Sequence, residues 1–251
     1  MICGCNIFQP KPLKGYFFAK YIGKGYFGTV SRHFHLKTLS MRAIKQTPTA
    51  KVRDCIENEI DILRSLEHPN VVKYFEVVKT PEYTYVVMEY LGKRSLYEMI
   101  KSGKVLLERN VRDIVTQIAS GLAYLHSQGV AHLDLKPNNV MMTVAGQCKI
   151  IDFGCSKRYP MSTTVGSFFW DTMADVWCFG ALLLFIVLPK VPSHLDCIMP
   201  DLEKVAEALK GKSKELLDLV HRMFELCRDK RITSAEVLKH RWLLGPKERM
   251  K

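Results

Sequence analysis

Residues 130–156, VAHLDLKPNNVMMTVAGQCKIIDFGCS, constrain the fold and function of this chain more than any other stretch. Within them, two short apolar runs at residues 140–142 and 149–151 flank a turn-like Ala145-Gly146 pair, which predicts a hairpin of two strands. Polar residues flank this hairpin on both sides, in HLDLKPNN before its first strand and in DFG after its second strand. The expected site of chemistry therefore lies at the ends of the hairpin.

These two polar clusters carry a family resemblance. His132-Leu133-Asp134 through Asn139 matches the pattern H-R-D-L-x-x-x-N, with leucine in place of its arginine, and Asp152 opens a D-F-G. The stretch resembles the eukaryotic protein kinase family. The alternative is that the first cluster is an ordinary polar loop and that the D-F-G is a coincidence. Both motifs would then have to occur at this separation by chance.

The resemblance implies a role for each of these polar residues. Transfer of a phosphoryl group needs a hydroxyl held in line with the γ-phosphate of ATP and cations over the phosphate oxygens. Asp134 is the expected acceptor of the substrate hydroxyl's proton, and Lys136 is the expected cation beside the transferred phosphate. Asn139 and Asp152 offer the oxygen ligands that Mg²⁺, or Mn²⁺ in its place, prefers. The Asp-Leu-Lys-Pro sequence is similar to the serine/threonine branch of the family.

A glycine pattern near the N-terminus fits the same family. Gly23, Gly25 and Gly28 with Val30 give G-x-G-x-x-G-x-V, a pattern that dinucleotide-binding folds share. The flanking residues separate the two possibilities, because Thr29 and Val30 favour continuation into another strand, whereas a dinucleotide fingerprint opens a helix. The glycines are expected to let the backbone approach the phosphates of ATP without an intervening Cβ.

Two charged residues are expected to position these phosphates. Met41 to Lys45 is the counterpart of the V-A-I-K motif, which makes Lys45 the candidate for binding the α- and β-phosphates. Residues 54–66 have helical periodicity, and Glu59 within them occupies the place of the family's ion-pairing glutamate. The alternative is that Glu57 or Glu59 is merely solvated.

The remaining nucleotide contacts follow from the resemblance alone. A strand is predicted at residues 83–88, followed by a hinge, with Met88 as the residue that limits access behind the adenine and Glu89 and Leu91 offering backbone hydrogen bonds. These are also ordinary core residue types. The full set expected to surround ATP comprises Ile22, Gly23, Lys24, Gly25, Gly28, Val30, Ala43, Lys45, Met88, Glu89, Leu91 and Met141.

The segment after D-F-G, residues 157–171, is expected to be regulated differently from the same segment of many kinases. Ser162, Thr163 and Thr164 are candidate phosphorylation sites, but Leu133 stands where many kinases have the arginine that binds a phosphate on this segment. Dependence on such phosphorylation is therefore expected to be weak. We expect the segment to be held by other contacts.

The sequence after Gly166 departs further. Residues 166–170 resemble the start of a substrate-docking loop, yet the A-P-E that should follow is missing, and about ten residues are absent relative to the family spacing. Arg231, which matches the usual partner of that glutamate, is then expected to be exposed or paired elsewhere, since an unpaired buried cation is costly. Asp175, at the start of D-x-W-x-x-G, is still expected to anchor the backbone of the catalytic loop.

The resemblance covers residues 16–244 and implies an α+β, bilobal protein kinase fold. The expected small lobe, residues 16–88, is an antiparallel β-sheet with one helix, and a hinge at 89–94 leads to a larger, mainly α-helical lobe at 95–244. Residues 1–251 then form a single kinase domain. Helices are predicted at 95–101, 111–126, 204–209, 214–227 and 234–242, the last with Ser234 as its N-cap, and the apolar run 176–188 is predicted to be a buried helix.

Composition bears on partners and location. The formal net charge of +12 fits a solvated basic face, acidic protein substrates or, less readily, nucleic acid. Acidic substrates are favoured by Ser95 and Asn138, which stand where kinases that prefer basic substrates carry glutamates. Eight cysteines without zinc-ligand spacing indicate free thiols in a reducing intracellular compartment, in the cytoplasm or the nucleus. The longest apolar run has 13 residues, too few to span a bilayer, so no membrane association is predicted.

The favoured interpretation is an active, monomeric serine/threonine protein kinase that uses ATP and Mg²⁺ on protein substrates. HLDLKP together with CKIIDFGCS is most similar to the Mos-type kinases, although the shortened docking loop departs from that type as well. The competing interpretation is a pseudokinase, a nucleotide-binding or scaffolding module left by the shortened loop. A nucleic-acid-binding protein is the third and weakest alternative.

Overall fold

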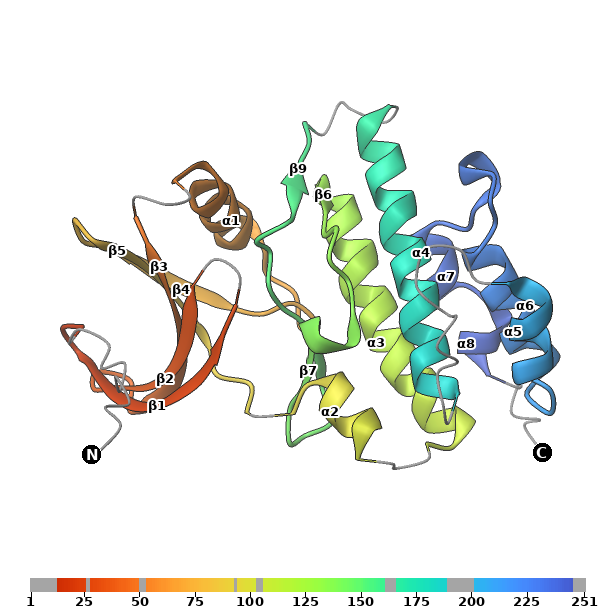
Figure 1. Cartoon of the computed structure of the whole chain (residues 1–251), viewed down its shortest axis with the longest axis horizontal. Coiled ribbons are helices and arrows are strands. Elements are labelled where there is room, and N and C mark those ends of the chain that lie inside the picture. The colour runs from red at the N-terminus through yellow and green to blue at the C-terminus, as the bar shows by residue number, and fades with distance from the viewer. Residues whose placement is uncertain are drawn as a thin grey trace, which may run out of the picture. The chain divides into compact units, whose positions relative to one another are not determined.

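A five-stranded antiparallel sheet forms the core of the first of two units in the computed structural model. The structure describes residues 13–25, 28–49, 53–92, 94–102, 106–160, 166–188 and 201–245, and the first unit comprises Met1–Ile56 and Tyr74–Tyr90. The strands lie in the order β1-β2-β3-β5-β4 (Figure 1). They are β1 (Tyr16–Lys24), β2 (Thr29–His35), β3 (Ser40–Pro48), β4 (Tyr74–Lys79) and β5 (Tyr83–Glu89).

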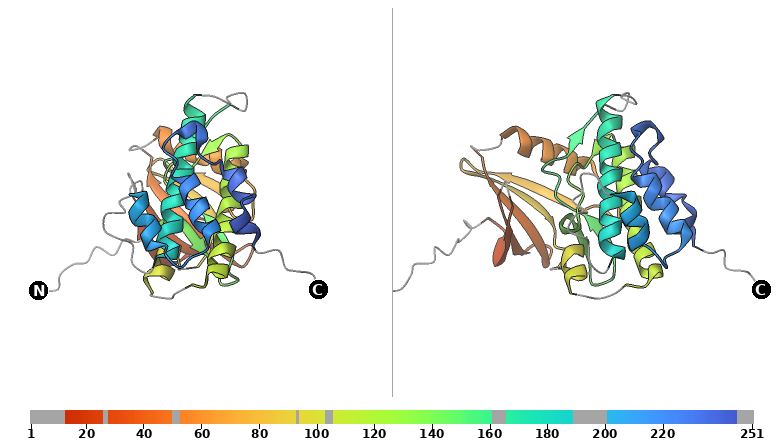
Figure 2. Two further views of the ribbon diagram at one scale, coloured as in Figure 1. Left: turned by 90° about the vertical axis from the view of Figure 1, so that its right-hand side faces the viewer. Right: turned by 45° about the vertical axis from the view of Figure 1, so that its right-hand side comes forward.

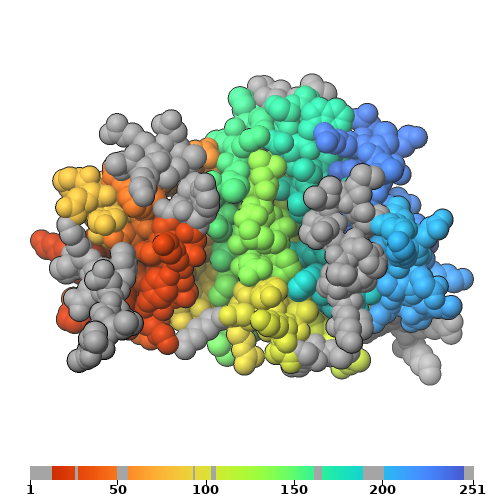
Figure 3. Space-filling view, viewed as in Figure 1, coloured from red at the N-terminus to blue at the C-terminus, as the bar shows by residue number. Residues whose placement is uncertain are grey.

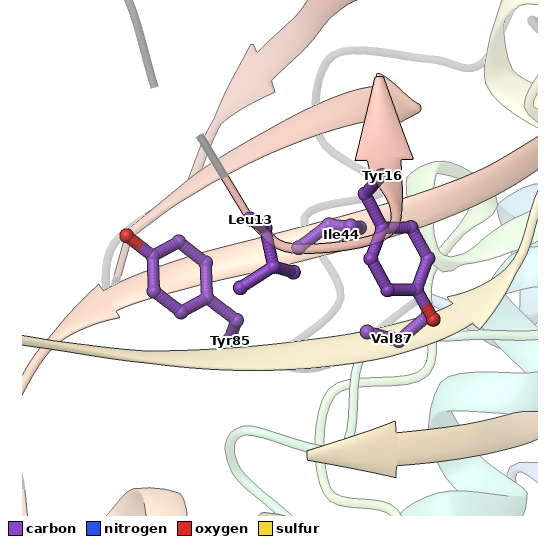
Figure 4. Close-up of a cluster of buried hydrophobic side chains, with 5 residues drawn as sticks. All are labelled: Leu13, Tyr16, Ile44, Tyr85 and Val87. Carbon is purple, nitrogen blue, oxygen red and sulfur yellow. The ribbon is translucent and has the colours of Figure 1, made fainter. Parts of the chain in front are cut away.

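Alternation of side chains along these strands builds the core of this unit. In β5, every second residue turns to the same face, and Val87 lies opposite Ile44 of β3 in the strand register. Tyr16 also donates its hydroxyl to Glu76 on β4, and burial followed by this hydrogen bond raises the pKa of Tyr16. The buried cluster on this face consists of Leu13, Tyr16, Ile44, Tyr85 and Val87 (Figure 4).

The second unit, Glu57–Lys73 and Leu91–Lys251, is mainly helical. Helix α1 (Arg53–Ser65) begins in the first unit and continues into the second. The other helices are α2 (Leu96–Lys101), α3 (Glu108–Ser127), α4 (Ser167–Val187), α5 (Leu202–Ala208), α6 (Lys214–Met223), α7 (Ser234–Leu238) and α8 (Arg241–Leu244), with short 3₁₀ turns η1 (Pro137–Asn139) and η2 (Arg228–Lys230). Two small antiparallel pairs complete it: β6 (Val130–Ala131) with β9 (Lys157–Arg158), and β7 (Val140–Met142) with β8 (Cys148–Ile150).

Two long helices organise this second unit. Helix α3 packs against α4, α7 and α8, and α4 also packs against α6 (Figure 1, Figure 2). Helix α4 is apolar on nearly all sides, with Val176, Phe179 and Leu183 completely buried, as expected for a helix inside a core. The apolar stripe of α3 recurs every three to four residues through Val111, Ile114, Val115, Ile118, Leu122 and Leu125.

Helix α4 also has the length and composition of a membrane span. Among the described residues it alone passes this test, with a mean hydropathy of 1.6 in its most apolar window. Because 61% of that window is buried inside the protein, and buried core helices pass the same test, the evidence for a membrane span is weak.

The start of α4 differs from the sequence expectation. Residues 166–170 were expected to begin a docking loop, but the helix already starts at Ser167, directly after Gly166. Gly166 has φ 86°, a backbone conformation that favours glycine, and it turns the chain into the first helical residue. Residues 167–170 are therefore the first turn of the central helix.

The C-terminal helices also require a correction. Ser234 is not the N-cap, because Thr233 accepts from the Glu236 backbone N–H while Glu236 bonds back to Thr233 in a capping box. The predicted helix 234–242 is in fact two short helices, since His240 caps α8 by accepting from the Trp242 N–H. Helix α6 likewise ends at Met223, before the predicted Cys227.

Candidate active site

Three of the predicted site residues lie within hydrogen-bonding distance of one another on the loop between β6 and β7. Lys136 Nζ is 2.8 Å and 2.7 Å from the two carboxylate oxygens of Asp134, and Asn139 Nδ2 donates to Asp134 Oδ2 at 2.8 Å. The same Asn139 amide donates to the Asp134 carbonyl at 2.8 Å. The side chains of Asp134 and Lys136 are 30% and 50% exposed, so the carboxylate is held in one place yet stays accessible to a substrate.

A buried carboxylate on α4 holds the backbone of this loop. Asp175 accepts from the His132 N–H through Oδ2 and from the Leu133 N–H through Oδ1, both at 2.7 Å, as the sequence predicted. Its Oδ2 also lies 3.0 Å from His126 Nε2, and His126 Nδ1 lies 2.7 Å from Ser234 Oγ. The catalytic loop is therefore fixed to α4, and through His126 to α3 and α7.

Two residues of the site adopt left-handed backbone conformations. Leu133 has φ 62° and Asp152 has φ 64°, and side-chain sterics make this region costly by about 1–2 kcal/mol for residues other than glycine. The two hydrogen bonds that the His132 and Leu133 N–H groups donate to Asp175 offset that cost at Leu133. Strained backbone of this kind clusters at functional sites.

The D-F-G segment lies against the catalytic loop. The Ile151 N–H donates to the Asn139 carbonyl at 2.9 Å, so Asp152 directly follows a residue bonded to Asn139. Phe153 is completely buried and contacts the ring of His132 edge-on, with 5.2 Å between the ring centroids. The two predicted metal ligands, Asn139 and Asp152, therefore lie on neighbouring backbone segments of one unit.

The donor set of this site fits Mg²⁺. Asn139 uses its amide N–H groups on Asp134, which leaves the amide oxygen for a metal, and Asp152 contributes a carboxylate. Within the described residues, no group of three or more His, Cys, Asp or Glu side chains could hold a metal by itself. Mg²⁺ is commonly held by one or two protein oxygens together with substrate phosphates, which is what Asn139 and Asp152 can provide.

Four of the predicted nucleotide contacts share one face of the sheet in the first unit. Val30 lies opposite Lys45, and Ala43 lies opposite Met88. Because residues opposite each other in a ladder, and every second residue along a strand, point to the same side, these four side chains form one surface. Ile22, Gly23 and Lys24 end β1, Gly25 and Gly28 lie in the turn after it, and Glu89 ends β5.

The other predicted residues belong to the second unit. Leu91 follows β5, Met141 lies in β7, and Glu59 lies in α1. Lys45 and Glu59 are both buried. The ion pair expected between them stays a prediction.

Gly28 has a structural reason to be glycine that the sequence did not indicate. A Cβ built at this position would lie 2.1 Å from the Gln46 carbonyl oxygen and 2.9 Å from Thr47 Oγ1 on β3. A Cβ at Gly23 would meet nothing within 4 Å, and one at Gly25 would make an ordinary contact. Close packing of the turn on β3 therefore excludes a side chain at Gly28, before any nucleotide is considered.

This difference predicts unequal effects of two alanine substitutions. Gly28→Ala is expected to lower the free energy of unfolding by about 1–3 kcal/mol, because the turn must move away from the β3 backbone. Gly23→Ala, the matched control in open space, is expected to change it little. Thermal denaturation of both variants without nucleotide checks this, and equal melting temperatures for Gly28→Ala and wild type would contradict it.

Arg231 is buried and is paired within the second unit, which is one of the two outcomes expected from the sequence. Its guanidinium donates to the Met173 carbonyl at 2.7 Å and to the Glu225 carbonyl at 2.9 Å, and it lies 4.7 Å from the centre of the Trp177 ring. Burial, followed by the charge of Arg228, lowers the pKa of Arg231. Backbone carbonyls and an aromatic face thus satisfy this cation.

Some residues around the site were missed by sequence reasoning. His126 bridges Asp175 and Ser234 but lies in a predicted helix without any local motif. Asp171 contacts Tyr159 and Lys157, although sequence spacing gives no reason to pair them. Only the fold brings these residues together.

Comparison with known proteins identifies the family of this chain. The sequence model of the protein kinase domain matches residues 16–243. The cytokinesis protein sepH of Aspergillus terreus is 31% identical over 253 residues, covering 93% of this chain and 19% of that protein. The probable serine/threonine-protein kinase MARK-A of Dictyostelium discoideum is 30% identical, covering 93% of this chain and 24% of that protein. The serine/threonine-protein kinase kin-29 of Caenorhabditis elegans is 33% identical, covering 88% and 30%.

The chain therefore belongs to the protein kinase family. Its α+β fold, with an antiparallel sheet in one unit and mainly helices in the other, is the fold expected from the sequence. The chain spans between about a fifth and a third of the length of these three relatives.

Proposed function

We propose that this chain is an active serine/threonine kinase that transfers the γ-phosphate of ATP to hydroxyl groups of protein substrates. The observation that carries the proposal is the Asp134 carboxylate, held by Lys136 and Asn139 on a loop whose backbone is bonded to Asp175. A carboxylate that is fixed and still partly exposed is suited to orient a hydroxyl and accept its proton.

Each site residue then has one task. Asp134 accepts the proton of the serine or threonine hydroxyl, and Lys136 compensates the charge of the phosphate as it moves. Asn139 and Asp152 hold Mg²⁺, which draws charge from the phosphate oxygens when bound. Lys45, kept in place by Glu59, binds the phosphates that stay behind. Ile22, Gly23, Lys24, Gly25, Gly28, Val30, Ala43, Met88, Glu89, Leu91 and Met141 surround the rest of the nucleotide.

We further propose that residues 1–251 act as a single kinase domain and as a monomer. Its lobes are residues 16–88 and 95–244, joined by the hinge at 89–94. Cys148, Cys155, Cys178 and Cys227 are free thiols, which is consistent with a reducing compartment inside the cell. The cytoplasm and the nucleus both satisfy this condition.

The proposed substrates are acidic proteins. The net charge is +12, and Ser95 and Asn138 leave the site without the two carboxylates that attract basic substrates. Ser95 instead caps α2, where its hydroxyl accepts from the Glu98 N–H. Within the family we also propose a Mos-like assignment, which rests on the HLDLKP and CKIIDFGCS sequences.

A pseudokinase is the second candidate, and one observation favours it. The residues expected to begin the docking loop, 167–170, are instead helical, so the surface that usually receives the substrate is changed. Such a module would bind nucleotide or a partner protein without phosphate transfer.

Labelled γ-phosphate transfer separates the two candidates. The purified chain is incubated with Mg-ATP and either casein, which is acidic, or histone, which is basic. An active kinase labels casein in preference to histone, and analysis of the product finds phosphoserine or phosphothreonine. An Asp152→Asn variant purified in parallel identifies labelling that comes from a contaminating kinase.

The opposite outcome is equally clear. If neither protein is labelled while Mg-ATP still raises the melting temperature, the chain is a nucleotide-binding pseudokinase. Equal labelling of histone and casein would refute the acidic-substrate proposal and leave the kinase activity standing.

A further inference from the structure

The segment after D-F-G is tied to the catalytic loop through its backbone. Lys157 and Arg158 of β9 pair with Ala131 and Val130 of β6, and the Tyr159 N–H donates to the Gly129 carbonyl at 2.8 Å. These contacts hold residues 157–159 directly beside the strand that leads into His132. Backbone hydrogen bonds therefore fix the segment through Tyr159.

Ser156 adds two further bonds at the start of this segment. Its hydroxyl donates to the His132 carbonyl at 3.1 Å, and its carbonyl accepts from Asn58 Nδ2 of α1 at 2.8 Å. The segment is thus fixed on one side by the catalytic loop and by α1.

A side-chain cluster fixes its other side to α4. The Tyr159 hydroxyl and Lys157 Nζ both bond to Oδ2 of Asp171, Lys157 at 3.2 Å. The Tyr159 ring packs on Phe168 with 5.1 Å between the ring centroids. Asp171 lies one helical turn before Asp175, so the two carboxylates project from the same side of α4. One helix therefore holds both the catalytic loop and the segment after D-F-G.

The electrostatics of the cluster keep both donors protonated. The hydrogen bond to Asp171, followed by its charge, raises the pKa of Lys157. Burial, followed by the hydrogen bond to Asp171, raises the pKa of Tyr159. Both groups ordinarily ionise near pH 10, so at neutral pH Asp171 faces a cation and a hydroxyl donor.

We propose that Asp171 serves as a built-in anion that holds the segment after D-F-G in place, so that this chain does not need a phosphate there. In many kinases, phosphorylation of this segment supplies an anion that orders it through basic residues. Here Leu133 cannot bind a phosphate, whereas a carboxylate from α4 already engages Lys157. The inference rests on the proposed kinase function, and it makes Asp171, Tyr159 and Lys157 positioning residues for Asp152.

The geometry suits this task. Figure 3 shows the atoms of the β6–β9 region and those of α4 meeting at the surface of the molecule. The Lys157 side chain is 59% exposed and Asp171 is 22% exposed, so the contact can be reached by solvent and by a protease if it opens. Ser162, Thr163 and Thr164, the candidate phosphorylation sites, lie outside the described residues.

Limited proteolysis tests the contact independently of activity. Trypsin cleaves after Lys157 and Arg158, which both remain in an Asp171→Asn variant. We expect that variant to be cut there about tenfold faster than wild type, because the segment opens more often. Tyr159→Phe is expected to speed cleavage as well. Asp113→Asn, which removes an exposed carboxylate on α3, is the matched control and should be cut at the wild-type rate.

A kinetic measurement tests the consequence for catalysis. Wild type treated with phosphatase, and shown to be unphosphorylated by mass spectrometry, is expected to keep its activity toward casein. Asp171→Asn is expected to lose about tenfold in kcat with the KM for ATP within about twofold of wild type, because the metal-binding Asp152 loses its support. Asp171→Glu, which keeps the charge, should lie closer to wild type.

Two results would overturn the proposal. One is tryptic cleavage of Asp171→Asn and Tyr159→Phe at the wild-type rate, and the other is an inactive dephosphorylated wild type that recovers when residues 162–164 are phosphorylated. If no preparation transfers phosphate, the proposed function has failed, and the proteolysis experiment still decides whether Asp171 holds the segment.

Discussion

Asp134→Asn is expected to lower kcat for phosphate transfer by a factor on the order of 10² to 10⁴, the range associated with loss of a positioned acid or base. Asparagine keeps the shape of the side chain but cannot accept the proton of the substrate hydroxyl. It also loses the ion pair with Lys136, whose Nζ now lies 2.8 Å and 2.7 Å from the carboxylate oxygens. Steady-state kinetics with casein and Mg-ATP measures the change.

The controls for this experiment are the stability of the folded variant and its binding of nucleotide. Asp134 is partly exposed and its backbone N–H lies 3.3 Å from His132 Nδ1, a contact that asparagine leaves unchanged. The melting temperature, and its rise on addition of Mg-ATP, should therefore stay near the wild-type values. If the variant retained more than about a tenth of the wild-type kcat, Asp134 would not be the proton acceptor.

The sequence predicted local elements better than contacts between distant segments. The hairpin of β7 and β8 was predicted from two apolar runs and a glycine turn, and the structure confirms it. Asp134, Lys136 and Asn139 were predicted to act together, and they lie within hydrogen-bonding distance, although their catalytic roles stay predictions. Local spacing suffices here, because all three residues lie on one short loop.

Contacts between distant segments could not be predicted in the same way. Arg231 was expected to be exposed or paired elsewhere, but the identity of its acceptors, the Met173 and Glu225 carbonyls, depends on how α4 and the chain after α6 pack. The Gly28 packing against β3 likewise depends on the strand register. Each contact requires a tertiary neighbour that sequence spacing does not specify.

Two errors had local causes that the sequence did contain. The capping box Thr233-x-x-Glu236 was present in the sequence, and it identifies Thr233 as the N-cap in place of Ser234. The early start of α4 also has a local cause, because Gly166 at φ 86° turns the chain directly into Ser167, the first residue of the helix.

Replacement of Asp175 is the second large effect that we expect. Asp175→Ala leaves two backbone N–H groups, the buried one of His132 and the partly buried one of Leu133, without the acceptor that now lies 2.7 Å away. Each buried donor without a partner costs about 1–3 kcal/mol, so the free energy of unfolding should fall by about 2–6 kcal/mol. Chemical denaturation monitored by tryptophan fluorescence measures this loss.

The asparagine variant separates the hydrogen bonds from simple packing. Asp175→Asn keeps the volume and one acceptor oxygen, but its NH₂ group faces one of the two backbone donors, so the expected loss is about 1–3 kcal/mol. Both variants should also lose phosphate transfer, since Leu133 at φ 62° relaxes when Asp175 no longer binds the loop, and Asp134 follows it. Equal stability of Asp175→Asn and wild type, with full activity, would show that the loop holds its conformation without this carboxylate.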